Sequence, residues 1–443
     1  MKILNAQIYQ EDGKLREGIV CTDGGLISEQ SGDTIELDAS GCYLIPGLVD
    51  IHLHGCAGYD YCSCGAQLTA TRLTAAQPIV TQPITAEINA ANSTVLHSPA
   101  AEQQNILSAI ARYEASCGVT TILPATMTLP QEQLLQICQH TADYDSLADP
   151  CGAEIAGIYM EGPFLSPEKS GAQDRDNLHL PDIQYFHTAN AAAAGLIRFL
   201  AVAPELDGAE TLIRSLTAAS MQDGVEAVIQ GKTEECAGLI QTDSLRITLA
   251  HTAADYDTAC RAFAAGASQV THLYNAMNGM HHRKPGLVGA AADTPGVFAE
   301  LICDGIHVHP AVVRQTFKMF GADRIIMISD SMEAAGMPDG HYELGGQSVI
   351  KDGRKAVIAY SSAAEPVLAG SVSTLADCLR TAVLEMRIPL EEAIRCAAVN
   401  PAKAAGIYDR CGSISIGKKA DLVLLEKESL RVRNVILRGH ALA

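Results

Sequence analysis

Short β-rich segments alternate along this chain with segments of helical pattern, and most of the β-rich segments end in a polar or ionisable residue. This alternation is typical of a parallel sheet whose strands are joined through helices. Eight such units suit a closed barrel, whose active site lies at the carboxyl ends of the strands. We therefore predict an α/β protein with a (β/α)8 TIM-like barrel. Its strands are predicted at residues 42–54, 119–128, 154–161, 197–205, 245–251, 269–275, 297–308 and 324–330.

The two ends of the chain lie outside this pattern. Residues 1–41 alternate like an antiparallel meander, and residues 412–436 do the same. A chain of 443 residues exceeds the usual size of one compact core, so a second unit is expected. We predict that residues 1–46 and 399–443 together form a small β-sandwich domain, and that residues 47–398 form the barrel domain.

Two segments within the barrel region interrupt the alternation. Residues 65–101 are rich in Ala, Thr, Gln and Ile, and between these limits only Arg72 and Glu87 carry a full formal charge. We interpret this segment as an insertion after the first strand that serves as a lid or a subunit contact. Residues 341–358 alternate around an Asp-Gly step, which predicts a hairpin after the eighth strand.

Composition and charge narrow the class of protein. Apolar residues make up 48% of the chain, and no run of apolar residues is long enough to span a membrane. A formal charge of −20 repels nucleic acid and anionic membranes, so an anionic ligand needs a local cationic pocket. The chain starts without a signal-peptide pattern, which leads us to expect a cytoplasmic protein. Its scattered cysteines, including the close pair Cys62 and Cys64, are expected to be reduced and buried.

Several predicted strands end in potential metal ligands. His52 and His54 are two residues apart near the end of the first strand, so their side chains point to the same face. Glu161, His251 and His272 end three further strands. One carboxylate and two imidazoles can form a three-ligand site with a position open for water, as catalytic metals require. Each residue alone is more often an ordinary polar group, but their equivalent positions favour a metal site.

Two further features could serve catalysis and anion binding. Asp330 ends the eighth predicted strand, where a carboxylate beside a metal can take a proton from water and pass it to a leaving amine. The alternative for such an aspartate is a helix N-cap or a structural ion pair. His307 and the His-His-Arg-Lys run at residues 281–284 are candidates for anion recognition, although a short basic run is usually a surface turn.

Taken together, these motifs resemble the N-acetylglucosamine-6-phosphate deacetylase family of the amidohydrolase superfamily. The matching segments run in order from about residue 46 to 425 and leave out mainly residues 65–101. The segment THLYNAMN with its downstream Arg-Lys-Pro-Gly is specific to this family. The matching segments are PGLVDIHLHGCAGYD, GVTTILPATMT, YMEGPFLSPEKSGA, LAHT, VTHLYNAMNGMHHRKPGLVGAA, CDGIHVHP, ISDSMEAAGM, LAGSVSTLADC and NPAKAAGI with GSISIGKKADLVLL.

The resemblance implies metal-dependent removal of the acetyl group from N-acetylglucosamine 6-phosphate. In that reading Glu161, His251 and His272 hold the main metal ion. His52 and His54 match family members that keep a second ion, with Glu161 then able to bridge the two. We therefore expect one or two divalent ions, such as Zn, Fe, Mn or Ni, in each subunit.

The same resemblance implies a base and a set of substrate contacts. Asp330 is expected to act as the general acid–base, and His307 to contact and polarise the substrate. Asn275, the backbone at Ala276 and Arg283 resemble the phosphate-binding group of the family. Members commonly form dimers, so Arg283 is expected to serve its own subunit or a neighbouring one.

One position departs from the family pattern. Gln173 stands where some members have a histidine that contacts the sugar, and glutamine can hydrogen-bond a hydroxyl but does not titrate. N-acetylgalactosamine 6-phosphate therefore remains an alternative substrate. Cyclic-amide hydrolysis is disfavoured because such enzymes commonly bridge two metals with a carboxylated lysine, where this chain has Glu161. A non-catalytic barrel is also disfavoured, since no expected ligand or base is missing.

Overall fold

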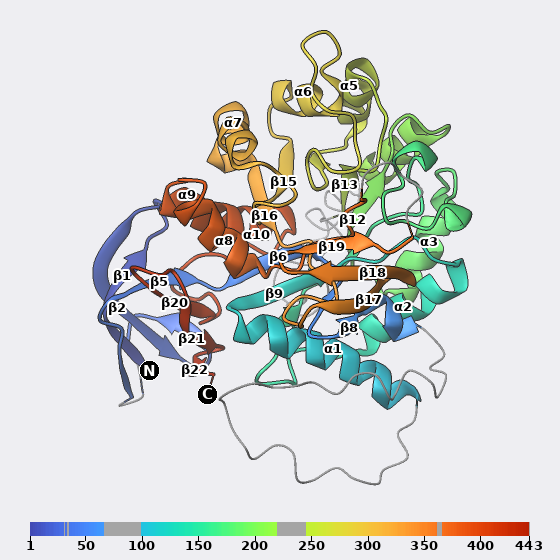
Figure 1. Ribbon diagram of the computed structural model, residues 1–443. Helices are drawn as coiled ribbons and strands as arrows, with labels where there is room; N and C mark the ends of the chain where they lie inside the picture. Colours follow the sequence, from blue (N-terminus) through green and yellow to red (C-terminus); the bar gives the residue numbers. More distant parts are fainter. Residues whose placement is uncertain (31, 33–34, 66–98, 219–244, 361–365, 443) are drawn as a thin grey trace.

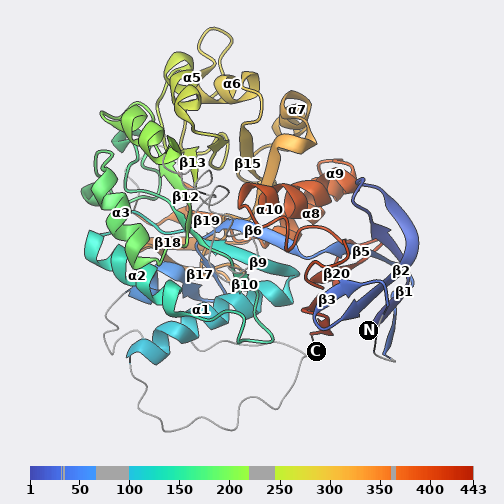
Figure 2. The same ribbon diagram turned by 180° about the vertical axis from the view of Figure 1, so that it is seen from behind.

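The computed structural model describes residues 1–443 except 31, 33–34, 66–98, 219–244, 361–365 and 443. Parallel strands lie at the centre of the molecule with helices around them, and a sheet made from both ends of the chain lies at one side (Figure 1). The view from behind shows the same arrangement, with the two termini close together (Figure 2). The insertion predicted at residues 65–101 falls almost wholly outside the described residues. No helix in the described part of the chain is long and apolar enough to cross a membrane.

The parallel strands form two sheets, ordered β10-β9-β6 and β11-β12-β13-β14-β15-β16. Each of the eight predicted segments contains at least one of these strands, but the strands are shorter than predicted. They are β6 (Leu48–Leu53), β9 (Val119–Pro124), β10 (Glu154–Ile155), β11 (Ile158–Met160), β12 (Ile197–Val202), β13 (Arg246–Leu249), β14 (Gln269–Val270), β15 (Phe298–Ile302) and β16 (Ile325–Ile328).

Two of the predicted strands are divided in the structure. The segment 42–54 breaks at Gly47, so that β5 (Cys42–Pro46) joins the terminal sheet and β6 joins the parallel one. A side chain at Gly47 would approach Oγ1 of Thr120 to 2.1 Å, so the close approach there requires glycine. The segment 154–161 breaks between β10 and β11, where the chain leaves β9 and starts to pair with β12.

The two parallel sheets contact each other at both edges. A parallel bridge between Ala125 and Tyr159 connects the end of β9 to β11. At the opposite edge, the N–H of Asp330 donates to the carbonyl oxygen of His52 over 2.9 Å, and the N–H of His54 donates to that of Ser331 over 2.7 Å. The carboxyl ends of β6 and β16 are therefore held next to each other.

Side chains along β16 alternate between two apolar clusters. Ile326 and Ile328 pack in one cluster with Phe199 of β12, whereas Ile325 and Met327 pack in a second cluster that includes helix residues. Burying each of these side chains contributes roughly 1.5–3 kcal/mol. The helices are α1 (Pro99–Ser116), α2 (Gln131–Asp143), α3 (Ile183–Ala192), α5 (Tyr256–Ala265), α6 (Gly286–Asp293), α7 (Pro310–Phe320), α8 (Leu375–Leu384), α9 (Leu390–Ile394) and α10 (Asn400–Ala404).

Both ends of the chain meet in one eight-stranded sheet, ordered β22-β21-β20-β5-β1-β2-β3 with β4 paired to β1. The predicted pairing of the terminal segments is confirmed, because β5 pairs with both β1 and β20. The predicted two-sheet sandwich is not what the described residues form. Strand β1 pairs with β2 on one edge and with β4 and then β5 on the other, which keeps all the strands in one sheet. The strands are β1 (Lys2–Tyr9), β2 (Leu15–Asp23), β3 (Leu26–Ser28), β4 (Glu36–Asp38), β20 (Leu422–Glu426), β21 (Val432–Leu437) and β22 (His440–Ala441).

The hairpin predicted after the eighth strand is confirmed and belongs to a three-stranded antiparallel sheet. Its strands are β17 (Gly340–Leu344), β18 (Gln347–Asp352) and β19 (Lys355–Ile358). Gly353 has a φ of 57°, the left-handed conformation that the turn between β18 and β19 requires. A second short hairpin, β7 (Gly55–Cys56) with β8 (Tyr59–Asp60), follows β6 directly. Cys62 and Cys64, just after it, are buried and unbridged, as expected.

Candidate active site

The predicted metal ligands gather at the carboxyl ends of the parallel strands, mostly just beyond the strands themselves. His251, His272 and Asp330 each lie two residues after the end of β13, β14 and β16. Their φ angles are 42°, 26° and 50°. Such left-handed conformations cost about 1–3 kcal/mol for non-glycine residues and cluster at functional sites. They also explain why the strands end before the ligands, since a left-handed residue cannot continue a strand.

One group of potential ligands comprises Glu161, His251 and His272. Oε1 of Glu161 lies 3.2 Å from Nε2 of His251 and 3.0 Å from Nε2 of His272. The two imidazole nitrogens are 3.2 Å apart. One carboxylate oxygen and two imidazole nitrogens therefore converge from three different strands, as predicted.

The second group is formed by His52, His54 and the other oxygen of Glu161. Oε2 of Glu161 lies 3.6 Å from Nε2 of His52 and 3.3 Å from Nε2 of His54. Oδ1 of Asp330 lies 3.3 Å from Nε2 of His54 and 3.7 Å from Nε2 of His52. Glu161 thus faces one pair of histidines with each oxygen, and Asp330 lies beside the second pair.

The charges of this cluster depend on one another because all its members are buried. Burial raises the pKa of the Glu161 carboxyl, but nearby imidazoles, first that of His52, hold it well below its ordinary value. Burial lowers the pKa of His54, yet hydrogen bonds to Asp330 and Glu161 raise it to about 9. Burial raises the pKa of Asp330, but the hydrogen bond from His54 together with the nearby imidazoles outweighs burial and lowers that pKa.

The donor set fits a divalent metal. Within each group the ligand atoms lie within 4.8 Å of one another. Nε2 of His52 is buried without a hydrogen-bond partner, as expected for an atom prepared to bind an ion. Nδ1 of His54 bonds to the carbonyl of Ala125 at 3.1 Å, and Nδ1 of His251 to that of Lys169 at 2.8 Å. These bonds leave Nε2 free to act as a ligand.

A cavity of about 370 Å³ opens beside these groups, a size within the range of small-ligand pockets. Leu344 of β17 and residues 366–368 contribute to its wall. The predicted site residues that line it are His54, Glu161, Gln173, His251, His272, Asn275, Ala276, His307 and Asp330.

His307 is held in this cavity by Asp304, a residue that sequence reasoning missed. Nδ1 of His307 lies 2.8 Å from Oδ2 of Asp304, and the two side chains are 5% and 0% exposed. Burial lowers the pKa of His307, but the hydrogen bond to Asp304 together with the charges of Asp304 and Asp330 outweighs burial and raises that pKa. The Asp-x-x-His spacing in CDGIHVHP was the available sequence signal. Asp304 thus favours a cationic His307 at the cavity wall.

The predicted phosphate-binding residues lie in two places. Asn275 and Ala276 line the cavity. Arg283 is exposed, does not line the cavity, and has its guanidinium 2.6 Å from Nε2 of His282. The backbones of His281 and Lys284 close a tight turn there. Within one subunit, the basic run is therefore a surface turn rather than part of the cavity.

Gln173 is occupied by contacts within the protein. Its Nε2 donates to Oε2 of Glu161 over 2.9 Å, and its Oε1 accepts the N–H of Thr128 over 2.7 Å. In this structure the amide therefore orients the Glu161 carboxylate, a role that the sequence did not suggest. Any contact with a sugar would compete with these bonds.

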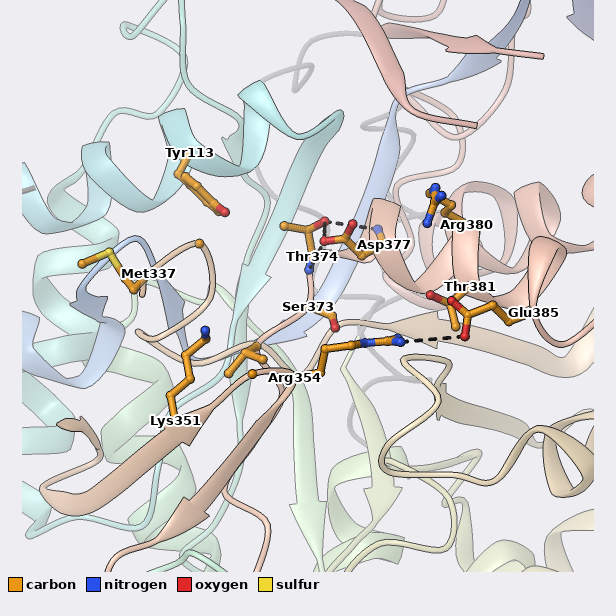
Figure 3. Close-up of a pocket in the computed structure, with 13 residues that line it drawn as sticks. Tyr113, Met337, Lys351, Arg354, Ser373, Thr374, Asp377, Arg380, Thr381 and Glu385 are labelled. Atoms are coloured by element: carbon orange, nitrogen blue, oxygen red, sulfur yellow. Dashed lines mark hydrogen bonds and ion pairs between the residues drawn. The ribbon is translucent and has the colours of Figure 1, made fainter. Parts of the chain in front are cut away.

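A second cavity, of about 470 Å³, is lined by none of the predicted metal ligands. Lys351 and Arg354, from the β18–β19 hairpin, line it together with residues at the start of α8, among them Thr374 and Asp377 (Figure 3). Arg354 also donates to the carbonyl oxygen of Asp304. Neither potential metal group includes a residue of this cavity. We therefore place the candidate active site in the smaller cavity.

Comparison with known proteins gives a consistent set of relatives. The model of the amidohydrolase family matches residues 43–442. N-acetylglucosamine-6-phosphate deacetylase of Bacillus subtilis is 31% identical over 447 aligned positions, covering 99% of this chain and 96% of that protein. N-acetylgalactosamine-6-phosphate deacetylase of Escherichia coli is 29% identical over 440 positions, covering 99% and 97%.

Solved structures are similar over the whole chain. The structure of N-acetyl-D-glucosamine-6-phosphate deacetylase from Mycobacterium smegmatis has a TM-score of 0.78 and 26% identity, and the match covers 100% of both chains. A mutant of that enzyme in complex with N-acetyl-D-glucosamine-6-phosphate has a TM-score of 0.77 and 26% identity, covering 100% and 98%. The similarity thus extends over the terminal sheet as well as the parallel strands.

Proposed function

The chain belongs to the N-acetylglucosamine-6-phosphate deacetylase family of amidohydrolases, and on that premise we propose that it hydrolyses the acetamide of N-acetylglucosamine 6-phosphate. The products are glucosamine 6-phosphate and acetate. The observation that carries this proposal is the buried Glu161 carboxylate, which faces two histidines with each oxygen beside Asp330 in one cavity.

The candidate ligands would hold a divalent metal ion that takes part in the proposed hydrolysis. A divalent ion held by Glu161, His251 and His272 would, when bound, polarise the acetyl carbonyl and lower the pKa of the attacking water. Imidazoles with one carboxylate suit Zn, Fe or Mn. His52 and His54 offer a second position beside the same Glu161 carboxylate.

Asp330 handles the proton in the proposed reaction. Its lowered pKa keeps it a carboxylate, which can accept a proton from the attacking water as the water oxygen adds to the acetyl carbon. When the C–N bond breaks, Asp330 returns this proton to the amine nitrogen. The water thus supplies one oxygen to acetate and one hydrogen to the amine.

His307 and the residues after β14 orient the substrate. The Nε2–H of a cationic His307 donates to the carbonyl oxygen as negative charge develops there. Asn275 and the backbone at Ala276 bind the phosphate within the subunit. Arg283, which is exposed on a surface turn, reaches the phosphate of a neighbouring subunit, so the working enzyme is a dimer.

We also propose that the chain has the closed barrel fold of this family. The edge contacts between β9 and β11 and between β6 and β16 support a (β/α)8 barrel that encloses the Ile326 cluster. Residues 47–398 would form this barrel domain, and residues 1–46 with 399–443 the small β domain.

Acetate release tests the proposal. The purified chain should release acetate from N-acetylglucosamine 6-phosphate, and removal of the phosphate from the substrate should lower kcat/KM strongly. Chelation should stop the release, and added Zn, Fe or Mn should restore it. Absence of release from any acetylated sugar phosphate by metal-loaded protein would refute the proposal.

A second candidate substrate is N-acetylgalactosamine 6-phosphate. It is favoured by the 29% identity to the Escherichia coli enzyme over nearly the whole chain, and by Gln173 in place of a histidine. The two sugar phosphates differ at one hydroxyl, so parallel kcat/KM measurements decide between them.

A further inference from the structure

Glu300 is a carboxylate buried in the middle of an apolar strand. It lies in β15, whose sequence is FAELI, and its side chain is 0% exposed. A carboxylate at such a position is costly unless hydrogen bonds compensate for the lost water. Neither the predicted ligand set nor the proposed mechanism assigns it a role.

Four donors satisfy this carboxylate. Oε1 accepts the hydroxyl of Tyr159 over 2.9 Å and the amide Nε2 of Gln269 over 2.6 Å. Oε2 lies 3.1 Å from Nδ1 of His52 and accepts the backbone N–H of His272 over 3.2 Å. Two carboxylate oxygens offer about four acceptor positions, so this set uses them fully.

The contact between Glu300 and His52 fixes which ring nitrogen of His52 carries the proton. Because Glu300 only accepts, the proton of the imidazole lies on Nδ1, and the lone pair of Nε2 points away from Glu300. That Nε2 is buried without a hydrogen-bond partner and lies 3.6 Å from Oε2 of Glu161. The ring also packs on Tyr159, with centroids 4.4 Å apart. His52 is therefore oriented as a ligand before any ion arrives.

One ligand of the second metal position is oriented by a side chain outside the cluster, whereas, within the residues that the structure describes, no imidazole of the first position is. Nδ1 of His54 and Nδ1 of His251 both bond to backbone carbonyls. His272 is held by Glu300 only through its backbone N–H. Among the described residues, His52 is thus the one predicted ligand whose imidazole bonds to a side chain beyond the cluster.

We propose that Glu300 is the positioning residue of the second metal position offered by His52, His54 and Glu161, where its carboxylate holds the His52 ring so that Nε2 faces that position. This inference deepens the proposed function and rests on it. Partners of this kind typically change metal affinity by about ten- to hundredfold when removed. The effect should fall on the second ion and spare the first.

Zinc counting on the full chain tests the proposal. Protein equilibrated at buffered free Zn²⁺ is analysed by mass spectrometry for zinc per subunit, and Co²⁺-loaded protein by absorbance for its ligand field. Wild type should hold two ions. Glu300→Met should hold one at the same free Zn²⁺, like His52→Gln, with the second dissociation constant raised about ten- to hundredfold.

Two variants distinguish a role of Glu300 in orienting His52 from a role in packing alone. In Glu300→Gln, the amide oxygen can still face His52 while the NH₂ group takes the place of Oε1, and the Gln269 amide can rotate so that its Oε1, which has no partner among the described residues, accepts this group. This variant should recover most of the second-site affinity. The control Gln269→Met removes one donor to the same carboxylate without touching His52, and it should keep two ions.

Three results would overturn the inference. The wild type could hold one zinc ion per subunit at saturating zinc, Glu300→Met could keep two zinc ions, or Glu300→Met could lose both ions equally. If the Met variant does not fold, Glu300→Asp decides, since it keeps the charge but draws it back from His52. Its second dissociation constant should rise at least tenfold, and a wild-type value would refute the role. Acetate release is measured separately, so a wild type that holds one ion at saturating zinc and still deacetylates would overturn this inference and leave the proposed function intact.

Discussion

Replacing Asp304 with asparagine should change the pH dependence of the reaction more than it changes the fold. Oδ1 of Asp304 accepts the N–H groups of Ile306 and His307, at 2.8 and 2.9 Å, and Oδ2 faces Nδ1 of His307. An asparagine oxygen can keep the two backbone bonds. Its NH₂ group then points at Nδ1, which must give up its proton and become the acceptor.

The consequence is a neutral His307 where the wild type has a cationic one. Because the pKa of His307 is raised, the cation is present below that raised pKa and is lost as the pH rises through it. A hydrogen bond to a charged group is worth about 1.5–3 kcal/mol and a neutral one about 0.5–1.5. The difference, about 1–2 kcal/mol, corresponds to roughly a five- to thirtyfold loss in kcat at pH values below the raised pKa of His307.

The assay is acetate release over pH 5–9 with kcat and KM resolved, together with zinc per subunit. The variant should lose the alkaline decline that His307 causes in the wild type and should keep its metal. Arg354→Gln serves as a control, because it removes the contact to the Asp304 carbonyl oxygen and leaves the carboxylate in place. A wild-type pH profile and a wild-type kcat in Asp304→Asn would refute the reasoning.

Three further outcomes are expected. Asp330→Asn should keep zinc and fold but lose about 10²–10⁴-fold in kcat, and near-normal turnover would exclude Asp330 as the base. Arg283→Ala should lower kcat/KM for the phosphorylated sugar about tenfold or more. Mixing Arg283→Ala chains with Asp330→Asn chains should restore activity if Arg283 serves the neighbouring subunit, and should not restore it if Arg283 serves its own subunit. Glu154→Gln should lower the free energy of unfolding by about 1–3 kcal/mol in urea, because Glu154 pairs with Arg410 and Lys419. The pKa of Glu154 is lowered, so this contribution is fully present above the ordinary carboxyl pKa and should disappear from wild type as the pH falls from there through the lowered pKa.

The candidate metal ligands could be predicted to lie together because parallel strands place their carboxyl ends at the same edge of the sheet. Knowing that Glu161, His251 and His272 follow β-rich segments was sufficient to bring them together. The strand ends were wrong by a few residues for a physical reason. The left-handed φ angles of His251 and His272 end the strands early, and single-residue backbone conformations leave no periodic signal in the sequence.

The partners of the ligands were not predicted, although one signal was present. An acidic residue within the apolar strand FAELI is unusual enough to suggest a buried, fully bonded carboxylate. Its partner could not be named, because Glu300 and His52 are 248 positions apart and meet only through the order of strands around the sheet. The same holds for Gln173, whose contact with Glu161 depends on the path of one loop.

The group that anchors each histidine also decides how easily a substitution could change the number of bound ions. A ligand anchored to a backbone carbonyl, as His54 and His251 are, keeps its anchor whatever side chains surround it. A ligand anchored to a carboxylate loses its anchor through one substitution. On the proposed site, position 300 is therefore a place where one substitution can tune the affinity for a second ion, while the candidate ligands Glu161, His251 and His272 are left unchanged.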